Sequence, residues 1–189
     1  MKKIILFISC IGILSIMGCK KVIDVYPPSN LYDANFYQTK SEIEVALTGC
    51  YYGMQKPLLE EWKMTELRSD NSLMGNPTSG SSDNRDLTDL DIFTPNTSHS
   101  GVYNYWLSTY YNIHNVNKVL ASVGVNYHPE TGALTYDSVS VNISMEDRKR
   151  IASEASFIRA YHYFNLVRLY GGVFLIHQPV SLQIGRAHV

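Results

Sequence analysis

The sequence lacks the residue patterns that catalysis and metal binding usually require. It has no Gly-x-Ser-x-Gly, His-Glu-x-x-His or Cys-x-x-Cys motif and no glycine-rich phosphate loop. Its histidines, at positions 99, 114, 128, 162, 177 and 188, are scattered without metal-ligand spacing. Glu60 and Glu61 are adjacent, and neighbours on a helix point in different directions, so they are poor candidates for the facing carboxylates of a glycosidase. We therefore predict no catalytic residue, no metal site and no cofactor.

An excess of positive charge is also lacking. The chain has 16 Lys and Arg against 17 Asp and Glu, a formal net charge of −1. Binding to nucleic acid would require a basic patch, so we predict no nucleic-acid partner. Apolar residues, by contrast, make up 45% of the chain and include 14 tyrosines. This composition indicates a globular protein, and 189 residues are enough for one domain with a core.

No apolar run reaches the length of roughly twenty residues that a membrane-spanning helix needs. The apolar stretch Ile4–Met17 follows two lysines, the pattern of an export signal. It leads into Gly18-Cys19, and the local sequence resembles a bacterial lipobox. We predict a lipoprotein signal peptide over residues 1–18 and lipidation of Cys19, with acyl chains that anchor the protein to the membrane. An ordinary secretory signal followed by a chance cysteine is the alternative.

Cysteine is scarce, since the chain has only three. Cys10 leaves with the predicted signal peptide and Cys19 carries lipid, so Cys50 has no partner for an intramolecular disulfide. Cys50 lies in an apolar helical stretch, and we interpret it as a small core residue.

Apolar spacing predicts an all-α fold. Residues recur at helical intervals over 36–54, 58–67, 102–123 and 145–170. The last of these helices starts at a capping residue, Ser144, and ends at Gly171-Gly172. Residues 75–100 are rich in Gly, Ser, Asn, Asp and Thr and are predicted to form a long loop. Its aspartates lack the spacing of an EF-hand, so we interpret them as solvated rather than as calcium ligands: Asp83, Asp86, Asp89 and Asp91.

The closing helix and the turn after it contain a distinctive set of residues: Glu154, Phe157, Arg159, Tyr161, Phe164, Arg168 and Gly171. Together they resemble the signature of the SusD/RagB family of nutrient-binding outer-membrane lipoproteins. Gly172 and Phe174 depart from it, where the family usually has Asp and Pro. The strings around Ala46–Tyr51 and Trp106–Leu120 also resemble family motifs.

The resemblance implies an architecture and a role. The expected fold is the N-terminal region of a SusD-like protein, mainly helical, with tetratricopeptide-like helix pairs and long irregular loops. The expected role is to bind a starch- or oligosaccharide-type glycan, or another nutrient, without being an enzyme. The ligand would pass to a SusC-like TonB-dependent transporter. The expected location is the bacterial outer membrane, facing the cell exterior.

The same resemblance suggests how the chain is divided. We expect a lipidated tether over residues 19–35 and an incomplete helical domain over residues 36–183. Residues 184–189 match the translation of a common sequencing adapter, and we exclude them from the fold.

The signature residues are interpreted as structural. Phe157, Tyr161 and Phe164 are expected to pack the helix into the repeat. On this basis Phe164→Asp should unfold the domain, at a cost of several kcal/mol, by burying an unpaired charge.

Candidate glycan-binding residues flank the long loop. Sugars are held by aromatic faces and by amide or carboxylate groups, and Asp70, Asn71, Tyr103 and Trp106 supply these groups. Trp106 also has the helical spacing of a core residue. Two other functions stay open. A helical scaffold lipoprotein without a ligand would not retain glycans, and a surface-anchored glycan hydrolase would release cleaved products.

Overall fold

The computed structural model describes residues 36–69, 71–75 and 85–179. The predicted signal peptide, the tether with Cys19, the glycan-binding candidate Asp70 and the C-terminal hexapeptide lie outside this part. The compact unit described below begins at Tyr37.

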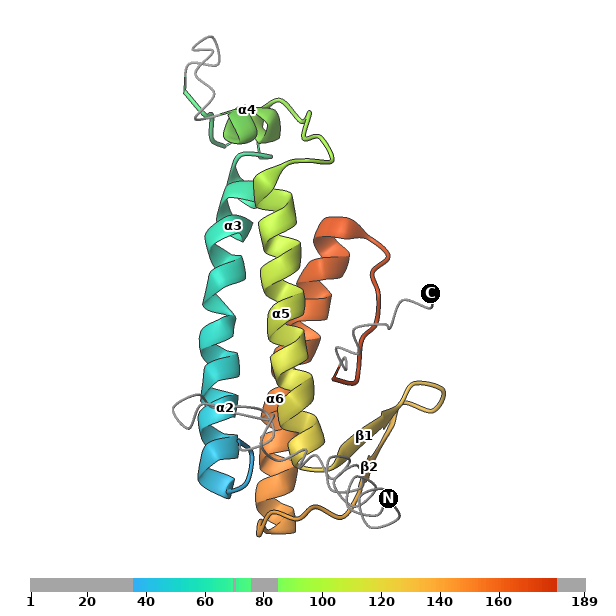
Figure 1. Ribbon diagram of the computed structural model, residues 1–189. Coiled ribbons are helices and arrows are strands. Elements are labelled where there is room, and N and C mark those ends of the chain that lie inside the picture. The colour runs from blue at the N-terminus through green and yellow to red at the C-terminus, as the bar shows by residue number, and fades with distance from the viewer. Residues whose placement is uncertain (1–35, 70, 76–84, 180–189) are drawn as a thin grey trace, which may run out of the picture. The chain divides into compact units, whose positions relative to one another are not determined.

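The described part is mainly helical, with one small antiparallel sheet (Figure 1), and this confirms the predicted fold class. The elements in chain order are α2 (Lys40–Gly53), α3 (Gln55–Glu66), α4 (Arg85–Asp91), α5 (Ser100–Ser122), β1 (Val125–His128), β2 (Ala133–Tyr136) and α6 (Met145–Tyr170).

Capping residues set the ends of the helices. Thr39 starts α2 with a capping box, in which its hydroxyl accepts from the backbone N–H of Glu42 and the Glu42 carboxylate accepts from that of Thr39. Ser144 starts α6, because its Oγ accepts from the backbone N–H of Asp147 at 3.1 Å. Gly171 ends α6 with a φ of +76°, a conformation that glycine adopts without strain. The predicted start of α6 at Ser144 and its predicted end at Gly171 are therefore confirmed, whereas α2 begins at Lys40 and not at residue 36 as predicted.

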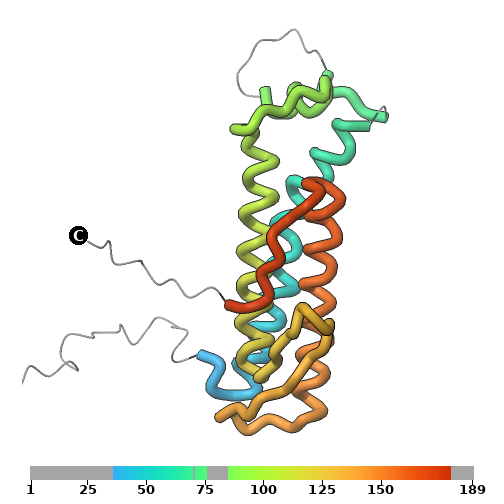
Figure 2. The backbone as a smooth tube through the Cα atoms, turned by 90° about the vertical axis from the view of Figure 1, so that its right-hand side faces the viewer, coloured from blue at the N-terminus to red at the C-terminus, as the bar shows by residue number. Residues whose placement is uncertain are grey.

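Helix α5 is the centre of the bundle and packs against α2, α3 and α6 (Figures 1 and 2). One core cluster joins α2, the second half of α5 and the first half of α6, and includes Ile43, Val116 and Ile151. A second cluster joins α3, α4, α5 and the end of α6, and includes Leu90, Tyr105 and Leu166. These clusters account for the helical spacing of the apolar residues in the sequence.

Cys50 is a buried core residue, as expected from the sequence. Burial raises the pKa of its thiol to about 12, so the group stays protonated at neutral pH. The backbone carbonyl of Cys50 accepts a hydrogen bond of 2.9 Å from the side chain of Asn112.

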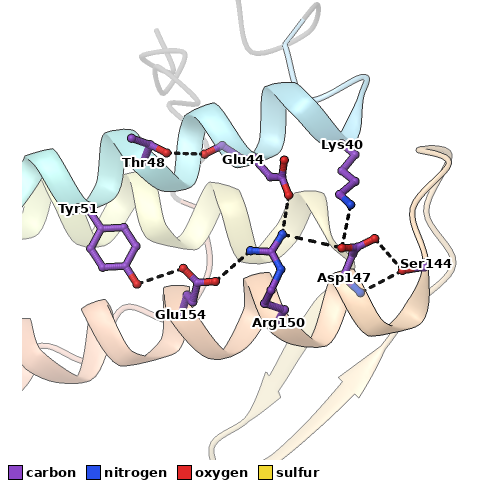
Figure 3. Close-up of polar contacts among 8 residues, drawn as sticks. All are labelled: Lys40, Glu44, Thr48, Tyr51, Ser144, Asp147, Arg150 and Glu154. Atoms are coloured by element: carbon purple, nitrogen blue, oxygen red, sulfur yellow. Dashed lines mark hydrogen bonds and ion pairs between the residues drawn. The ribbon is translucent and has the colours of Figure 1, made fainter.

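A ladder of charged groups joins α2 to α6 along their exposed edge (Figure 3). Lys40 pairs with Asp147 at 2.8 Å, and Arg150 reaches Glu44 and Glu154 at 2.5 and 3.0 Å. Hydrogen bonds from Lys40 and from Ser144 lower the pKa of the Asp147 carboxyl, in that order of size. The signature residue Glu154 also accepts a hydrogen bond of 3.2 Å from the hydroxyl of Tyr51 in α2 and so joins the two helices. The pairs are partly exposed, so each contributes little energy, but their spacing fixes the register of α6 against α2.

The segment between α5 and α6 is a β-hairpin, in which Val125 pairs with Tyr136 and His128 with Ala133. Arg148 of α6 holds the hairpin to the bundle. Its Nε donates to the carbonyl of Val123 at 2.8 Å, and Nη2 donates to that of Asp137.

Two sequence predictions are wrong in this structure. The predicted loop over residues 75–100 contains the helix α4, whose Leu90 is buried in the second core cluster. The expected core residues Phe157 and Phe164 are 63% and 62% exposed. Both lie on the side of α6 that faces away from α5, because the opposite face already supplies the packing residues.

Candidate functional site

Two of the predicted glycan-binding residues, Asn71 and Tyr103, lie at the end of the bundle where α3 ends and α5 begins, next to α4 (Figure 1). Asn71 follows the end of α3 and is exposed. Tyr103 lies in the first turn of α5, and its ring is also exposed. Asp70 is not in the described part. The structure therefore places two of the four candidates at a common, solvent-facing end.

Trp106 is placed differently from Tyr103. Its ring packs at a tilt against Tyr110, with centroids 4.7 Å apart, and edge-on against Tyr170 at 5.1 Å. It belongs to the partly buried margin of the second core cluster. Of the two readings open for Trp106 in the sequence, its contacts favour packing.

A hydrogen-bonded junction between α4 and α5 shapes this end. The Asp86 carboxylate accepts from the backbone N–H of Ser100 at 2.9 Å and from its hydroxyl. His99 is buried, and its Nε2 lies 2.7 Å from the carbonyl of Asp86 while its Nδ1 caps α5 at the N–H of Val102. The hydrogen bonds from Ser100 lower the pKa of Asp86. Asp86 thus attaches α4 to the start of α5, which is a structural role.

Two hollows flank that junction. One, of about 360 Å³, is polar in character and is lined by Glu60, Lys63, Asp86 and His99 among others. The other, of about 310 Å³, is lined mainly by apolar residues and includes Phe93 and Arg68. Phe93 is well exposed at the mouth of the second hollow and sits beyond α4 with a positive φ of 57°. An exposed aromatic ring beside polar groups is the kind of surface that stacks on sugar rings.

A larger apolar groove, of about 670 Å³, lies between the α2–α3 junction and α5. We define the apolar groove by its exposed side chains Tyr52, Leu59, Leu107 and Tyr111. Ser108 and Asn112 also line it. The sequence analysis missed this groove, although the spacing of Tyr103, Leu107 and Tyr111 places three large side chains on one face of α5.

An extended strap, residues 171–179, is held against the bundle by the signature residue Arg159, by Tyr163 of α6 and by Asn117 of α5. Tyr163 exchanges two hydrogen bonds with the backbone of Ile176, at 2.7 and 3.0 Å. Arg159 donates to Asn117 at 2.9 Å and to the carbonyl of His177 at 3.3 Å. Asn117 in turn donates to the carbonyls of Ile176 and Gln178. Arg159 therefore has a structural role, since it binds the strap to the bundle.

In the described ranges, no group of three or more His, Cys, Asp or Glu side chains is placed to hold a metal ion. Of the acidic residues considered as calcium ligands, Asp89 pairs with Arg85 and Asp91 accepts from the backbone of Met74 at 3.2 Å. None of the described helices has both the length and the apolar character needed to cross a membrane.

The amino-acid sequence of this chain matches a known family. Residues 21–189 match a family described as "Starch-binding associating with outer membrane", so the chain belongs to the SusD-like family. It is 28% identical over 172 residues to SusD-like protein P2 of Formosa agariphila, covering 89% of this chain and 30% of that protein. It is 27% identical over 169 residues to SusD-like protein P38 of the same organism, covering 89% and 29%. The chain thus spans about a third of the length of these relatives. No solved structure matches it.

Proposed function

We propose that this chain forms the N-terminal part of a cell-surface lipoprotein that captures a glycan and passes it, chemically unchanged, to a SusC-like TonB-dependent transporter. The observation that carries the proposal is the family match over residues 21–189, whose description names starch binding and the outer membrane. The lipobox-like sequence that ends at Cys19 supports the lipid anchor.

The loop end of the bundle is the proposed capture face. Tyr103 and Phe93 present exposed rings, and Asn71 presents an exposed amide. Rings of this kind stack on the apolar faces of sugars while amides bond to hydroxyl groups. Lys63 and Glu60 in the adjoining hollow add a donor and an acceptor, 3.3 Å apart from each other.

The apolar groove is the proposed contact with the transporter. Its side chains are large, apolar and exposed, and they lie on three helices that the core holds rigidly. Aromatic and aliphatic anchors in a preformed hollow are the usual centre of a protein interface. The capture face and the transporter contact therefore adjoin on α5, where Tyr103 lies one helical turn from Leu107 of the apolar groove.

Binding of glycans to the full-length protein tests the capture proposal. We expect soluble starch to retard the protein in affinity electrophoresis and expect Tyr103→Ala to weaken the interaction at least about tenfold, a change of 1.4 kcal/mol. The matched control is Tyr52→Ala, an exposed tyrosine of the apolar groove, which should bind as the wild type does. Chromatography of the recovered glycan should show no shortened products. If Tyr103→Ala left glycan retention unchanged, this end of the bundle would not be the capture site. If shortened glycans were released, the protein would be a hydrolase and not a binding protein.

Co-purification with the transporter tests the second contact. The double variant Leu107→Ser/Tyr111→Ser should lose the SusC-like partner from detergent-solubilised outer membranes while it keeps wild-type glycan retention. Equal recovery of the partner with both proteins would assign the transporter contact to another surface.

A further inference from the structure

Helix α6 has apolar side chains on two opposite faces. Ile151, Ile158 and Leu166 are fully buried against the rest of the bundle. On the other side, Phe157, Phe164 and Val167 are 63%, 62% and 53% exposed. Ala160 is exposed between them, and spacings of three, four and seven residues place all of these side chains on one face of a helix. We call Phe157, Ala160, Phe164 and Val167 the outer stripe.

The outer stripe differs from the outer surface of the first half of the same helix. There, apart from Met145 at the start of the helix, the exposed residues are polar or charged: Glu146, Lys149, Arg150 and Ser153. A helix that borders solvent normally keeps such residues on its outer face. The change from charged to aromatic residues midway along α6 indicates that the second half is built to be covered on both sides.

In the described part of the chain, nothing packs over the outer stripe closely enough to bury its side chains. The strap is fixed by Tyr163, Arg159 and Asn117 and runs back beside α5 and α6 (Figure 2). Arg168 places its guanidinium 5.4 Å from the centre of the Phe164 ring, yet that ring is still largely exposed. Two exposed phenylalanines seven residues apart on one helix face are typical of a surface that packs against another helix.

The length of the relatives indicates what fills this contact. The matched region is 30% of SusD-like protein P2, which leaves about 70% of that protein without a counterpart in this chain. We propose that the outer stripe packs against an amphipathic helix from the part of the full-length protein that this chain does not include. The helix would present aliphatic side chains to Phe157 and Phe164 and complete a second layer on α6. The proposal is independent of glycan capture and of the transporter contact.

Cysteine labelling tests this packing directly. Phe157→Cys and Phe164→Cys are placed in this chain and in the longer, full-length protein that the proposal requires, and each protein is reacted with a maleimide. Cys50 is buried, with a thiol pKa of about 12, so its background reaction is slow. We expect fast labelling in the short chain and at least about tenfold slower labelling in the long one, because the thiol then reacts only when the packing opens. The control Thr135→Cys, exposed on the hairpin, should react equally fast in both.

Each other outcome overturns the proposal. Equal labelling of the stripe in the two polypeptides would show that the rest of the protein does not cover it. Protection in the short chain itself, increasing with protein concentration alongside a dimer mass by light scattering, would make a second copy the occupant. Protection of the long form only after the transporter is added would make the transporter the occupant. A reading frame that adds no further sequence would remove the proposed helix.

Discussion

Asn112 lies where three helices meet. From α5 its Nδ2 donates to the carbonyl of Cys50 in α2 and lies 2.8 Å from Nε2 of His162 in α6. All three residues are buried, so an unmade hydrogen bond here would cost about 1 to 3 kcal/mol. Gly53 leaves the space that this amide occupies. A Cβ added at Gly53 would lie 2.2 Å from Oδ1 of Asn112.

Gly53→Ala should therefore displace the Asn112 amide and lower the free energy of unfolding by about 2 to 3 kcal/mol. Gly49→Ala is the matched control on the same helix, because a Cβ at Gly49 meets nothing within 4 Å. The control should leave stability unchanged or raise it by up to about 1 kcal/mol, since alanine is the better helix former. Urea titrations followed by circular dichroism measure both. Equal stability of the two variants would show that the bundle relaxes around Asn112 at no cost.

Burial lowers the pKa of His162 from 6.5 to about 4, so the folded protein holds this imidazole neutral. The unfolded chain binds a proton below pH 6.5 and the folded chain does so only near pH 4. The contribution of neutral His162 is thus complete above pH 6.5 and is lost as the pH falls towards 4, by up to about 3 kcal/mol.

His162→Gln should remove this pH dependence, because the glutamine oxygen can still accept from Asn112 and does not titrate. Between pH 6.5 and 4 the unfolding free energy of the variant should fall less than that of the wild type. His128→Gln, at an exposed site on the hairpin, should follow the wild-type curve. Parallel curves for wild type and His162→Gln would mean that His162 is accessible to protons in the folded state.

At the scale of whole elements, the strap is attached to α5 by the buried side chain of Asn117. Asn117 donates to the carbonyls of Ile176 and Gln178, at 3.0 and 3.3 Å, and accepts from Arg159. Burial lowers the pKa of the Arg159 guanidinium, since the charged form loses solvation there. Loss of the amide would leave this group short of a partner.

Asn117→Leu should cost about 2 to 4 kcal/mol in unfolding free energy. Hydrogen exchange at residues 173–178 should accelerate more than exchange in the core of α5, because the strap loses its anchor first. Asn104→Leu, at an exposed position of the same helix, should change both measurements little. Uniform acceleration along the whole chain would show that Asn117 supports the bundle and not the strap in particular.

The helices themselves could be predicted because their signals are local. Ser144 and Gly171 bound α6 in the sequence and in the structure, and the predicted range 36–54 contains all of α2, although that helix begins only at Lys40. Helix α4 could not be predicted from the sequence. Its seven residues, Arg85–Asp91, are mostly polar, and the hydrogen bonds of Asp86 to the start of α5 stabilise it. Helical length and capping follow from neighbouring residues, whereas α4 depends on a contact with another element.

At the scale of the whole molecule, the candidate glycan-binding site could be predicted only in part. Composition directed attention to the loop end, where Tyr103 and Asn71 are indeed exposed. Helical spacing favoured Trp106 as the core residue and left Tyr103 as the better binding candidate, and the packing of Tyr110 and Tyr170 against the Trp106 ring agrees. The apolar groove was missed because helical periodicity shows that a face is apolar but not whether another element covers it. The same limit explains the error at Phe157 and Phe164.

The exposure of Phe157 and Phe164 can be tested by comparing this chain with a longer, full-length protein. In this chain Phe164→Asp should change the unfolding free energy by less than about 1 kcal/mol, because the site is exposed and the new carboxylate lies near Arg168. Leu166→Asp, two residues away and fully buried, should cost at least about 4 kcal/mol. In the longer polypeptide we expect the cost of Phe164→Asp to rise to at least about 3 kcal/mol, since the aspartate would then be buried beneath a second helix. Calorimetric unfolding of both variants in both lengths measures the difference. If Phe164→Asp remained as mild in the long form as in the short one, α6 would be an outer helix of the full protein and the aromatic stripe would have to serve another partner.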